Sequence, residues 1–509
     1  MNFVKRLRVE FPSFERKVFQ YYIKRLTSSS SNSIGEKEKR KEYVLPSFSE
    51  DGNFSKQSTH SGQPTPSSHP HILRKGEVTG GIIKEEYINR QFRLMDLLNK
   101  KGSKKDHHIV ILPGMPRRYM IDKIPFLFRQ DTDMLYLSGC LEPDCVLVLH
   151  TVGNSSGNYK ALIFTPPYDP SKELWDGPRT SPSGAPNIWG VNEGLPIPEL
   201  PRYLSSVEKE LHSLNVYHHT DPLNLEIHNL LKDWFSMRSR NMQSPKEFIH
   251  ALRVVKSPAE INLMRETCRI SAESIKATIS GCRVPTYEHH LYATVDYHCR
   301  MRGAEYLAYP PVIAGGSRAN IIHNISNNNI VHPGELVLMD AGSEFRGYSG
   351  DVTRVWPVSK EFTPGQRDLY EAVLDVQKHT IAACAERPSL NQLFTLMCSR
   401  LGSALQELCI LPKSLSDSQL SRAAYGFCPH HVSHYLGMDV HDTPLIPKSN
   451  NISVGSIITV EPGVYISEKN TAVDPRYLGI GIRLEDDVLI CDDCVEVLTN
   501  ACPKHPDEN

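Results

Sequence analysis

Hydrophobic and polar positions divide the larger part of the chain into two stretches with different patterns. In the first stretch, short apolar runs at residues 109–112, 145–149 and 161–164 alternate with helix-like segments such as residues 85–99. Short apolar runs bounded by polar residues are typical of buried strands, and their alternation with helical segments indicates an α/β architecture. We therefore predict an α/β domain over residues 69–245.

The pattern changes near residue 245. Ser257 is followed by Pro258 and, three positions after the serine, by Glu260, which is the capping-box signature at the start of a long amphipathic helix. Helical spacing continues to about Arg302 and then gives way to strand-like stretches. We therefore predict an α+β domain over residues 246–509, with strands near residues 336–340, 352–358, 456–460 and 481–490.

A predicted hairpin at residues 336–358, LVLMDAGSEFRGYSGDVTRVWPV, carries two aspartates. A turn centred between Phe345 and Arg346 would place Asp340 opposite Asp351, and cross-strand neighbours have Cβ atoms about 4.5–5.5 Å apart. Carboxylates this close repel each other unless a cation lies between them or one of them keeps its proton. The pair therefore indicates a metal or a shared proton, with two solvent-facing turn aspartates as the alternative.

Two glutamates interrupt apolar strand patterns farther along the chain. Glu461 ends the apolar run of ITVEPGVYI, and Glu485 lies in the middle of GIGIRLEDDVLI. An unpaired charge is costly to bury, so each glutamate is expected to have a partner. A histidine-rich segment, CPHHVSHYLGMDVHDTP at residues 428–444, shortly precedes Glu461 in the sequence. Four carboxylates and an imidazole suit Mn²⁺, Co²⁺ or Zn²⁺, and a dinuclear site about 3.5–4 Å across can share bridging carboxylates. The combined pattern favours a metal centre.

Several dispersed segments carry a resemblance to a known family. In order and spacing, YPPVIAGGSRANIIH, MDAGSEFRGYSGDVTRVWPV, HHVSHYLGMDVHD, VEPGVYI and GIRLEDD resemble the aminopeptidase P and prolidase branch of the pita-bread metallopeptidases, family M24B. The earlier segments HPHILRKGEVT, FRQDTDMLYLSG and ELWDGPR resemble the N-terminal domain of aminopeptidase P. The resemblance covers nearly everything from His69 onward. It implies an aminopeptidase P N-terminal domain at residues 69–245 and a pita-bread catalytic domain at residues 246–509.

The resemblance also implies a role for particular residues. It implies two divalent metal ions, with Mn²⁺ as the first choice and Co²⁺ or Zn²⁺ as alternatives. The five implied ligands are Asp340, Asp351, His434, Glu461 and Glu485. Of these, Asp351 and Glu485 would bridge both ions. The implied catalytic residues are His323, His441, Glu461 and Arg483, and the implied substrate-binding residues are Tyr309, His323, His430 and His441. His431 stands where the family usually has a small residue, so its role stays open between structure and function.

The activity that the resemblance implies is release of the first residue from peptides with proline at the second position. A hydroxide that bridges the two metal ions would attack the scissile carbonyl, and Glu461 would accept and return the proton. A close variant is trimming of imported mitochondrial proteins after presequence removal. The alternatives are a prolidase-type dipeptidase and a non-catalytic pita-bread binding module. A homodimer is implied by the family alone.

The N-terminal segment has a different composition. Residues 1–27 are basic and carry apolar side chains at near-helical spacing before a run of serines, which is typical of a mitochondrial presequence. We predict cleavage near residues 25–28 and a location in the mitochondrial matrix, with an additional cytoplasmic location as an option. The alternative for the segment itself is a basic, disordered tail. Residues 28–68 are rich in Ser, Pro, Lys and Glu and are predicted to form a disordered linker.

Composition narrows the possible partners. A formal net charge of −1 and a pI near 7.1 provide no overall field for nucleic acid or an acidic membrane surface. We therefore expect no nucleic-acid binding. No apolar run approaches the roughly 20 residues of a membrane-spanning helix, so we also expect no membrane insertion. Twelve scattered cysteines with one close pair, Cys491 and Cys494, indicate a reducing compartment and give little support for a separate zinc site.

Overall fold

The computed structural model describes residues 61–508, except residues 103–105, 154–157, 212–213, 220–221 and 237–241. The predicted presequence and most of the predicted linker lie outside the described residues. Within the described part of the chain, no helix combines the length and the apolar character needed to cross a membrane.

The N-terminal domain is built on a six-stranded mixed sheet. Its central strands are buried along their whole length, because alternate residues serve two different cores. Val110 and Leu112 belong to one core cluster, whereas Ile109 and Ile111 belong to another. The three predicted apolar runs are confirmed as β3, β6 and β7. In sheet order the strands are β10 (Met242–Gln243), β9 (Leu214–His218), β3 (His107–Pro113), β6 (Val146–Thr151), β7 (Tyr159–Thr165) and β8 (Glu193–Pro196).

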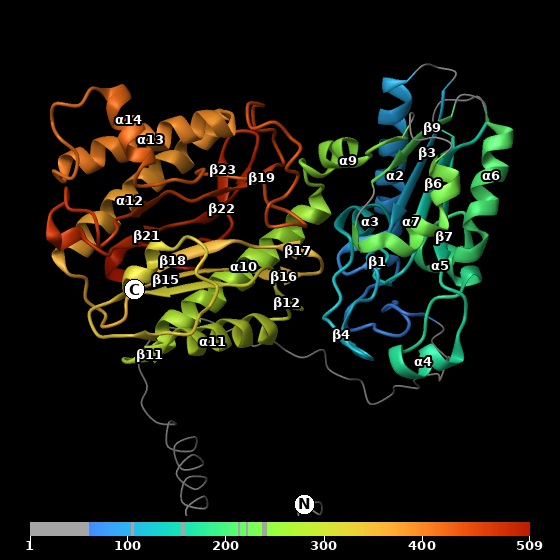
Figure 1. The fold of residues 1–509 in the computed structure, drawn as a ribbon, viewed down its shortest axis with the longest axis horizontal. Helices are drawn as coiled ribbons and strands as arrows, with labels where there is room; N and C mark the ends of the chain where they lie inside the picture. The colour runs from blue at the N-terminus through green and yellow to red at the C-terminus, as the bar shows by residue number, and fades with distance from the viewer. Residues whose placement is uncertain are drawn as a thin grey trace, which may run out of the picture. The chain divides into compact units, whose positions relative to one another are not determined.

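Helices surround this sheet, and two short hairpins complete the domain (Figure 1). The predicted helix at residues 85–99 is confirmed as α2 (Lys84–Lys101). The hairpins are β1 (Glu77–Thr79) with β2 (Ile82–Ile83) and β4 (Tyr119–Ile121) with β5 (Ile124–Pro125). The other helices are α3 (Thr132–Ser138), α4 (Pro170–Asp176), α5 (Ala185–Trp189), α6 (Leu200–Glu210), α7 (Leu225–Leu230) and α8 (Lys232–Ser236), and α9 (Lys246–Arg253) follows the predicted domain boundary.

The C-terminal domain begins with the predicted capped helix. Ser257 accepts a hydrogen bond from the backbone of Glu260, whose carboxylate accepts one from the backbone of Ser257, so the capping box at the start of α10 (Pro258–Gly281) is confirmed. The strands lie between two groups of helices (Figure 1). One group is α10 with α11 (Glu288–Met301), and the other is α12 (Pro364–Ala383), α13 (Leu390–Glu407) and α14 (Asp417–Tyr425).

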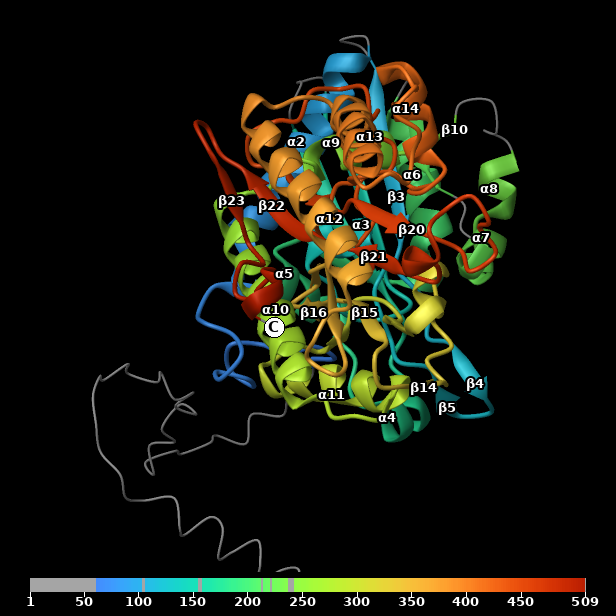
Figure 2. The same ribbon diagram turned by 90° about the vertical axis from the view of Figure 1, so that its left-hand side faces the viewer.

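The strands of this domain form several small antiparallel sheets. Figure 2 looks onto the domain and shows α12 beside β21, with which it is in contact. The predicted α/β domain followed by an α+β domain is confirmed. The strands are β11 (Thr286–Tyr287), β12 (Tyr306–Leu307), β13 (Val312–Gly315), β14 (Ile330–Val331), β15 (Leu336–Ala341), β16 (Ser343–Phe345), β17 (Tyr348–Ser349), β18 (Val352–Pro357), β19 (Ile457–Val460), β20 (Gly463–Tyr465), β21 (Gly481–Arg483), β22 (Asp486–Ile490) and β23 (Val495–Val497).

The predicted register of the central hairpin is wrong by two positions. Asp340 lies opposite Thr353, not Asp351, because the turn is centred between Arg346 and Gly347. These two residues have φ values of 54° and 79°, the left-handed conformations that a tight hairpin turn requires. Asp351 is therefore a diagonal neighbour of Asp340 on the same face of the pair, which still leaves the two side chains within reach of each other.

A buried arginine connects the two domains. Arg253, the last residue of α9, donates to Asp133 of α3 at 2.6 Å and to Asp439 at 2.8 Å, and it also pairs with Asp442. Its side chain is only 3% exposed. Arg253 therefore neutralises carboxylates from both domains in one buried network.

Removal of this guanidinium should leave the buried Asp133 without its counter-charge, whereas Asp442 keeps Lys256 and Asp439 keeps Arg129. We expect Arg253→Met to lower the free energy of unfolding by about 3–5 kcal/mol. Arg265→Met, which breaks an exposed pair with Glu496, should cost about 1 kcal/mol or less. Urea denaturation of both variants measures the difference, and equal small losses would contradict the importance assigned to the buried network.

Candidate metal centre

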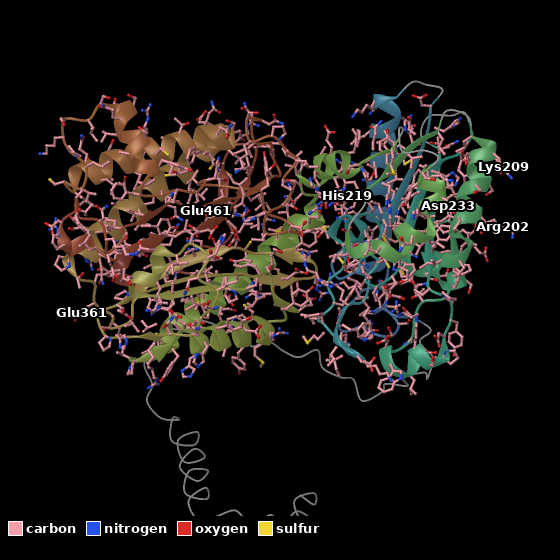
Figure 3. The ribbon with its side chains drawn as sticks, viewed as in Figure 1. Arg202, Lys209, His219, Asp233, Glu361 and Glu461 are labelled. Carbon is pink, nitrogen blue, oxygen red and sulfur yellow. The ribbon has the colours of Figure 1, made fainter. Side chains whose placement is uncertain are left out.

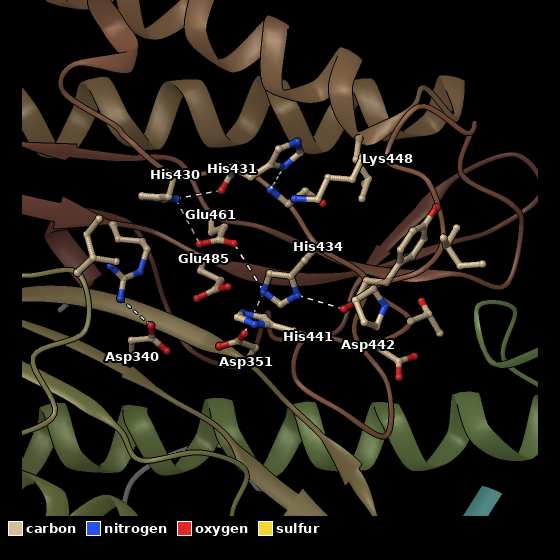
Figure 4. Close-up of a pocket in the computed structure, with 18 of the residues that line it drawn as sticks. Asp340, Asp351, His430, His431, His434, His441, Asp442, Lys448, Glu461 and Glu485 are labelled. Carbon is tan, nitrogen blue, oxygen red and sulfur yellow. Dashed lines mark hydrogen bonds and ion pairs between the residues drawn. The ribbon is translucent and has the colours of Figure 1, made fainter. Parts of the chain in front are cut away.

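The five predicted metal ligands come together from separate elements of the C-terminal domain. Asp340 lies in β15 and Asp351 directly precedes β18, whereas Glu461 directly follows β19. His434 lies in the loop after α14. Glu485 occupies the break between β21 and β22, so the predicted strand at residues 481–490 is in fact two strands. All five line one cavity of about 540 Å³ in the domain interior, where Figure 3 labels Glu461 and Figure 4 shows the side chains.

The ligand atoms are close enough to share an ion. One ligand atom from each of Asp351, His434 and Glu485 lies within 4.8 Å of the others. His434 Nε2 lies 3.4 Å from the Asp351 carboxylate and 3.6 Å from that of Glu461. His434 Nδ1 is 3.1 Å from the carbonyl oxygen of Tyr435, and a hydrogen bond donated there leaves Nε2 free to face the carboxylates.

Tyr309 and Arg483 orient the two aspartates. The Tyr309 hydroxyl lies 2.6 Å from a carboxylate oxygen of Asp340 and 2.5 Å from one of Asp351. Arg483 Nη2 donates to Asp340 at 2.6 Å, and its Nη1 donates to the Tyr465 hydroxyl at 2.9 Å. Hydrogen bonds from Arg483 and Tyr309 therefore hold the two aspartates in place.

The electrostatics of the cluster call for added positive charge. Burial raises the pKa of Asp351 and Glu485 and raises the pKa of Glu461 to about 7. Burial disfavours a charged His434, but its hydrogen bond to Asp351 and the charge of Glu461 raise its pKa to about 9. Protons therefore balance the carboxylates when no cation does. Oxygen-rich donors with one imidazole fit divalent ions, which would replace these protons.

A buried ion-pair network fixes the segment that carries Glu485. Arg354 donates to the backbone oxygen of Glu485 at 2.5 Å and to the Asp486 carboxylate at 2.8 Å. Lys504 also pairs with Asp486, and the Thr353 hydroxyl donates to the Glu485 carboxylate at 2.5 Å. Glu485 is consequently restrained at both its backbone and its side chain.

Asp487 is a supporting residue that the sequence reasoning missed. Its fully buried carboxyl group accepts a hydrogen bond from the backbone N–H of Asp351 at 3.0 Å and from the Cys268 thiol at 3.1 Å. Asp487 therefore connects β22, which begins directly after Glu485, to the backbone of Asp351, the other ligand that is predicted to bridge the two ions. Asp487 could have been found from the sequence, because it is an acidic residue within an apolar strand pattern, the same feature that identified Glu485.

Three histidines predicted to face the substrate line the same cavity. His323 and His441 are exposed on its wall, and the His441 ring lies 4.5 Å from that of His434. Burial lowers the pKa of His441 and lowers that of His430 to about 4, so both rings are neutral at physiological pH. His430 Nε2 lies 2.9 Å from the hydroxyl of Tyr465, a second residue that the sequence reasoning missed.

The structure places two further predicted residues differently. Tyr309, expected to wall the proline pocket, directs its hydroxyl at the aspartates and is not among the residues that line the cavity. His431 lines the cavity and stacks on Phe394 with ring centroids 5.0 Å apart, and its Nδ1 accepts from the backbone of Ser433. In the described part of the chain, Cys491 and Cys494 belong to no group of side chains spaced to hold a metal.

Comparisons with known proteins agree with this geometry. The model of metallopeptidase family M24 matches residues 262–492, and that of the aminopeptidase P N-terminal domain matches residues 87–217. Xaa-Pro aminopeptidase 3 of Rattus norvegicus is 41% identical over 451 residues, which cover 87% of this chain and 88% of the relative. The mitochondrial intermediate cleaving peptidase 55 of Arabidopsis thaliana is 37% identical over 443 residues, 87% of this chain and 85% of the relative.

A solved structure shows the same likeness. The crystal structure of Icp55 from Saccharomyces cerevisiae superposes with a TM-score of 0.76 at 30% identity. The match covers 85% of this chain and 98% of the solved chain. The likeness therefore extends over both described domains.

The contact between Asp487 and Asp351 should influence metal affinity. We expect Asp487→Leu to weaken Mn²⁺ binding about 10- to 100-fold, because it removes the acceptor that positions the Asp351 backbone. Asp487→Asn, which keeps an acceptor oxygen, should lose less. Isothermal titration calorimetry on the metal-free protein measures the affinity, with exposed Asp493→Leu as the control. Wild-type affinity in Asp487→Leu would refute the positioning role.

Proposed function

The chain belongs to metallopeptidase family M24, in the branch that carries an aminopeptidase P N-terminal domain, and on this premise we propose that it is a metal-dependent Xaa-Pro aminopeptidase. It would release the first residue of peptides with proline at the second position. The observation that carries the proposal is the convergence of all five expected ligands and three further histidines on one cavity.

Asp340, Asp351, His434, Glu461 and Glu485 would hold the divalent ions that the family uses. We propose Mn²⁺ as the physiological ion, because four carboxylates and one imidazole form a hard, oxygen-rich donor set. Two such ions would lower the pKa of a shared water and supply a hydroxide at neutral pH.

The residues of the chain itself perform the remaining chemistry. The Glu461 carboxylate would accept a proton from the attacking water and return it to the departing nitrogen. His323 and His441 can donate N–H groups to the carbonyl oxygen as negative charge develops on it. His430 offers an uncharged surface for a proline ring, and proline brings no amide N–H that would need an acceptor.

Removal of one residue from imported proteins after presequence cleavage is a second candidate function. It is favoured by the 37% identity to a relative named as a mitochondrial intermediate cleaving peptidase. This role fits the basic N-terminal segment of the chain and a location in the mitochondrial matrix. We propose a homodimer as the working assembly.

Two of the alternatives are less well supported. A non-catalytic binding module would not need a complete ligand set, yet all five ligands are present. A prolidase-type dipeptidase is disfavoured by the aminopeptidase P N-terminal domain.

The metal-dependent activity can be tested with one ligand variant. We expect the Mn²⁺-loaded protein to cleave Xaa-Pro peptides, and Asp351→Asn to lose at least about a hundredfold in kcat/KM because it removes a bridging negative charge. Arg265→Met, an exposed change in the same domain, is the matched control. The proposal fails if the wild-type protein releases no residue or if Asp351→Asn keeps its rate.

The choice of substrate separates the candidate functions. We expect release of the first residue from tripeptides and longer peptides with proline second, identified by mass spectrometry. Cleavage confined to dipeptides would instead show that the protein is a prolidase-type dipeptidase. N-termini of mitochondrial proteins from cells with and without the enzyme test the trimming role, since one extra residue should remain when it is absent.

A further inference from the structure

The cavity extends beyond the metal ligands to a wall with a different character. The lining there includes the apolar side chains of Leu390, Pro444 and Ile446 as well as His431 and Lys448, and a backbone hydrogen bond from Asn391 N–H to the Lys448 carbonyl oxygen brings the segment of Leu390 beside Lys448. Figure 4 labels Lys448 beside His431, on the opposite side of the view from Asp340. The cavity therefore has an acidic end and an apolar end with one ammonium group.

Lys448 differs from the other charged residues of the cavity wall. Arg483 is engaged by Asp340 and Tyr465, and Asp442 is engaged by Lys256 at 3.1 Å and by Arg253. The Lys448 ammonium makes no hydrogen bond or ion pair with another described residue, although its side chain is exposed on the cavity wall. Its charge is therefore available to a ligand.

The surroundings of Lys448 supply no counter-charge. The adjacent His431 stacks on Phe394, and burial together with the charge of Lys448 lowers the pKa of His431 to about 4. The His431 ring is therefore uncharged at neutral pH, and the charge of Lys448 faces the space of the cavity.

We propose that Lys448 forms a subsite for a carboxylate of the substrate, so that the enzyme prefers Xaa-Pro peptides that carry a negative charge near the cleaved bond. This inference rests on the proposed aminopeptidase function. Lys448 would repel the substrate's amino terminus, which disfavours a peptide that enters the cavity with that terminus next to Lys448. The carboxylate is a side chain at the first or third position or the C-terminus of a short peptide.

Three matched peptide pairs test this subsite with the Mn²⁺-loaded enzyme. The pairs are Glu against Gln at the first position, Glu against Gln at the third, and a free C-terminus against a C-terminal amide in a tripeptide. At least one pair should show a preference of about three- to tenfold in kcat/KM for the carboxylate, the range between an exposed ion pair and a charged hydrogen bond. The pair that responds identifies the source of the carboxylate.

Two variants of Lys448 make the test specific. In Lys448→Met the preference should fall to about one, and in Lys448→Glu it should reverse. Lys469→Met removes an exposed lysine that does not line the cavity and should keep the wild-type ratio. In the wild-type enzyme, the preference should decline as ionic strength rises, since salt screens an exposed charge.

Failure of this inference is distinguishable from failure of the proposed function. If the wild-type enzyme cleaves the neutral peptides but treats every pair alike, or if the preference survives in Lys448→Met, the carboxylate subsite is refuted. If the wild-type enzyme cleaves none of the peptides, the aminopeptidase function itself is refuted, and the subsite with it.

Discussion

Negative charge buried in one cavity is the constraint on which the C-terminal domain depends. Carboxyl groups taken from water into a protein interior lose hydration that only a cation, a proton or hydrogen bonds can replace. Here Asp351 and Glu485 are buried, and burial raises the pKa of both groups. Divalent ions bound among them would favour the ionised form of both groups.

The three consecutive acidic residues after Leu484 show how the fold distributes this charge. Glu485 faces the cavity, whereas Asp486 points to the opposite side of β22, where Arg354, Lys504 and Gln377 of α12 contact it. Asp487 returns to the cavity side and holds the backbone of Asp351. The alternation of side chains along a strand thus assigns one residue to the metal ions, one to an internal ion pair and one to the positioning of a second ligand.

Much of this organisation could be predicted from the sequence. Apolar runs identified β3, β6 and β7, and the capping box identified the start of α10, because these signals are local. The charged residues within apolar strands drew attention to Glu461 and Glu485, and family resemblance then supplied their partners. The hairpin register was wrong because a left-handed residue other than glycine, Arg346, occupies the turn.

The remaining features depend on contacts between distant segments. Helices α12 to α14 were not predicted individually, although Thr363 and Ser389 cap two of them with capping boxes of the same kind. Nothing local to Tyr465 shows that its hydroxyl meets both His430 and Arg483.

The central claim is that the buried carboxylates and His434 form a centre for two metal ions. Anomalous X-ray diffraction from a Mn²⁺-loaded crystal tests it most directly. We predict two manganese peaks per chain, enclosed by Asp340, Asp351, His434, Glu461 and Glu485; the absence of peaks there, or peaks only elsewhere, would contradict it.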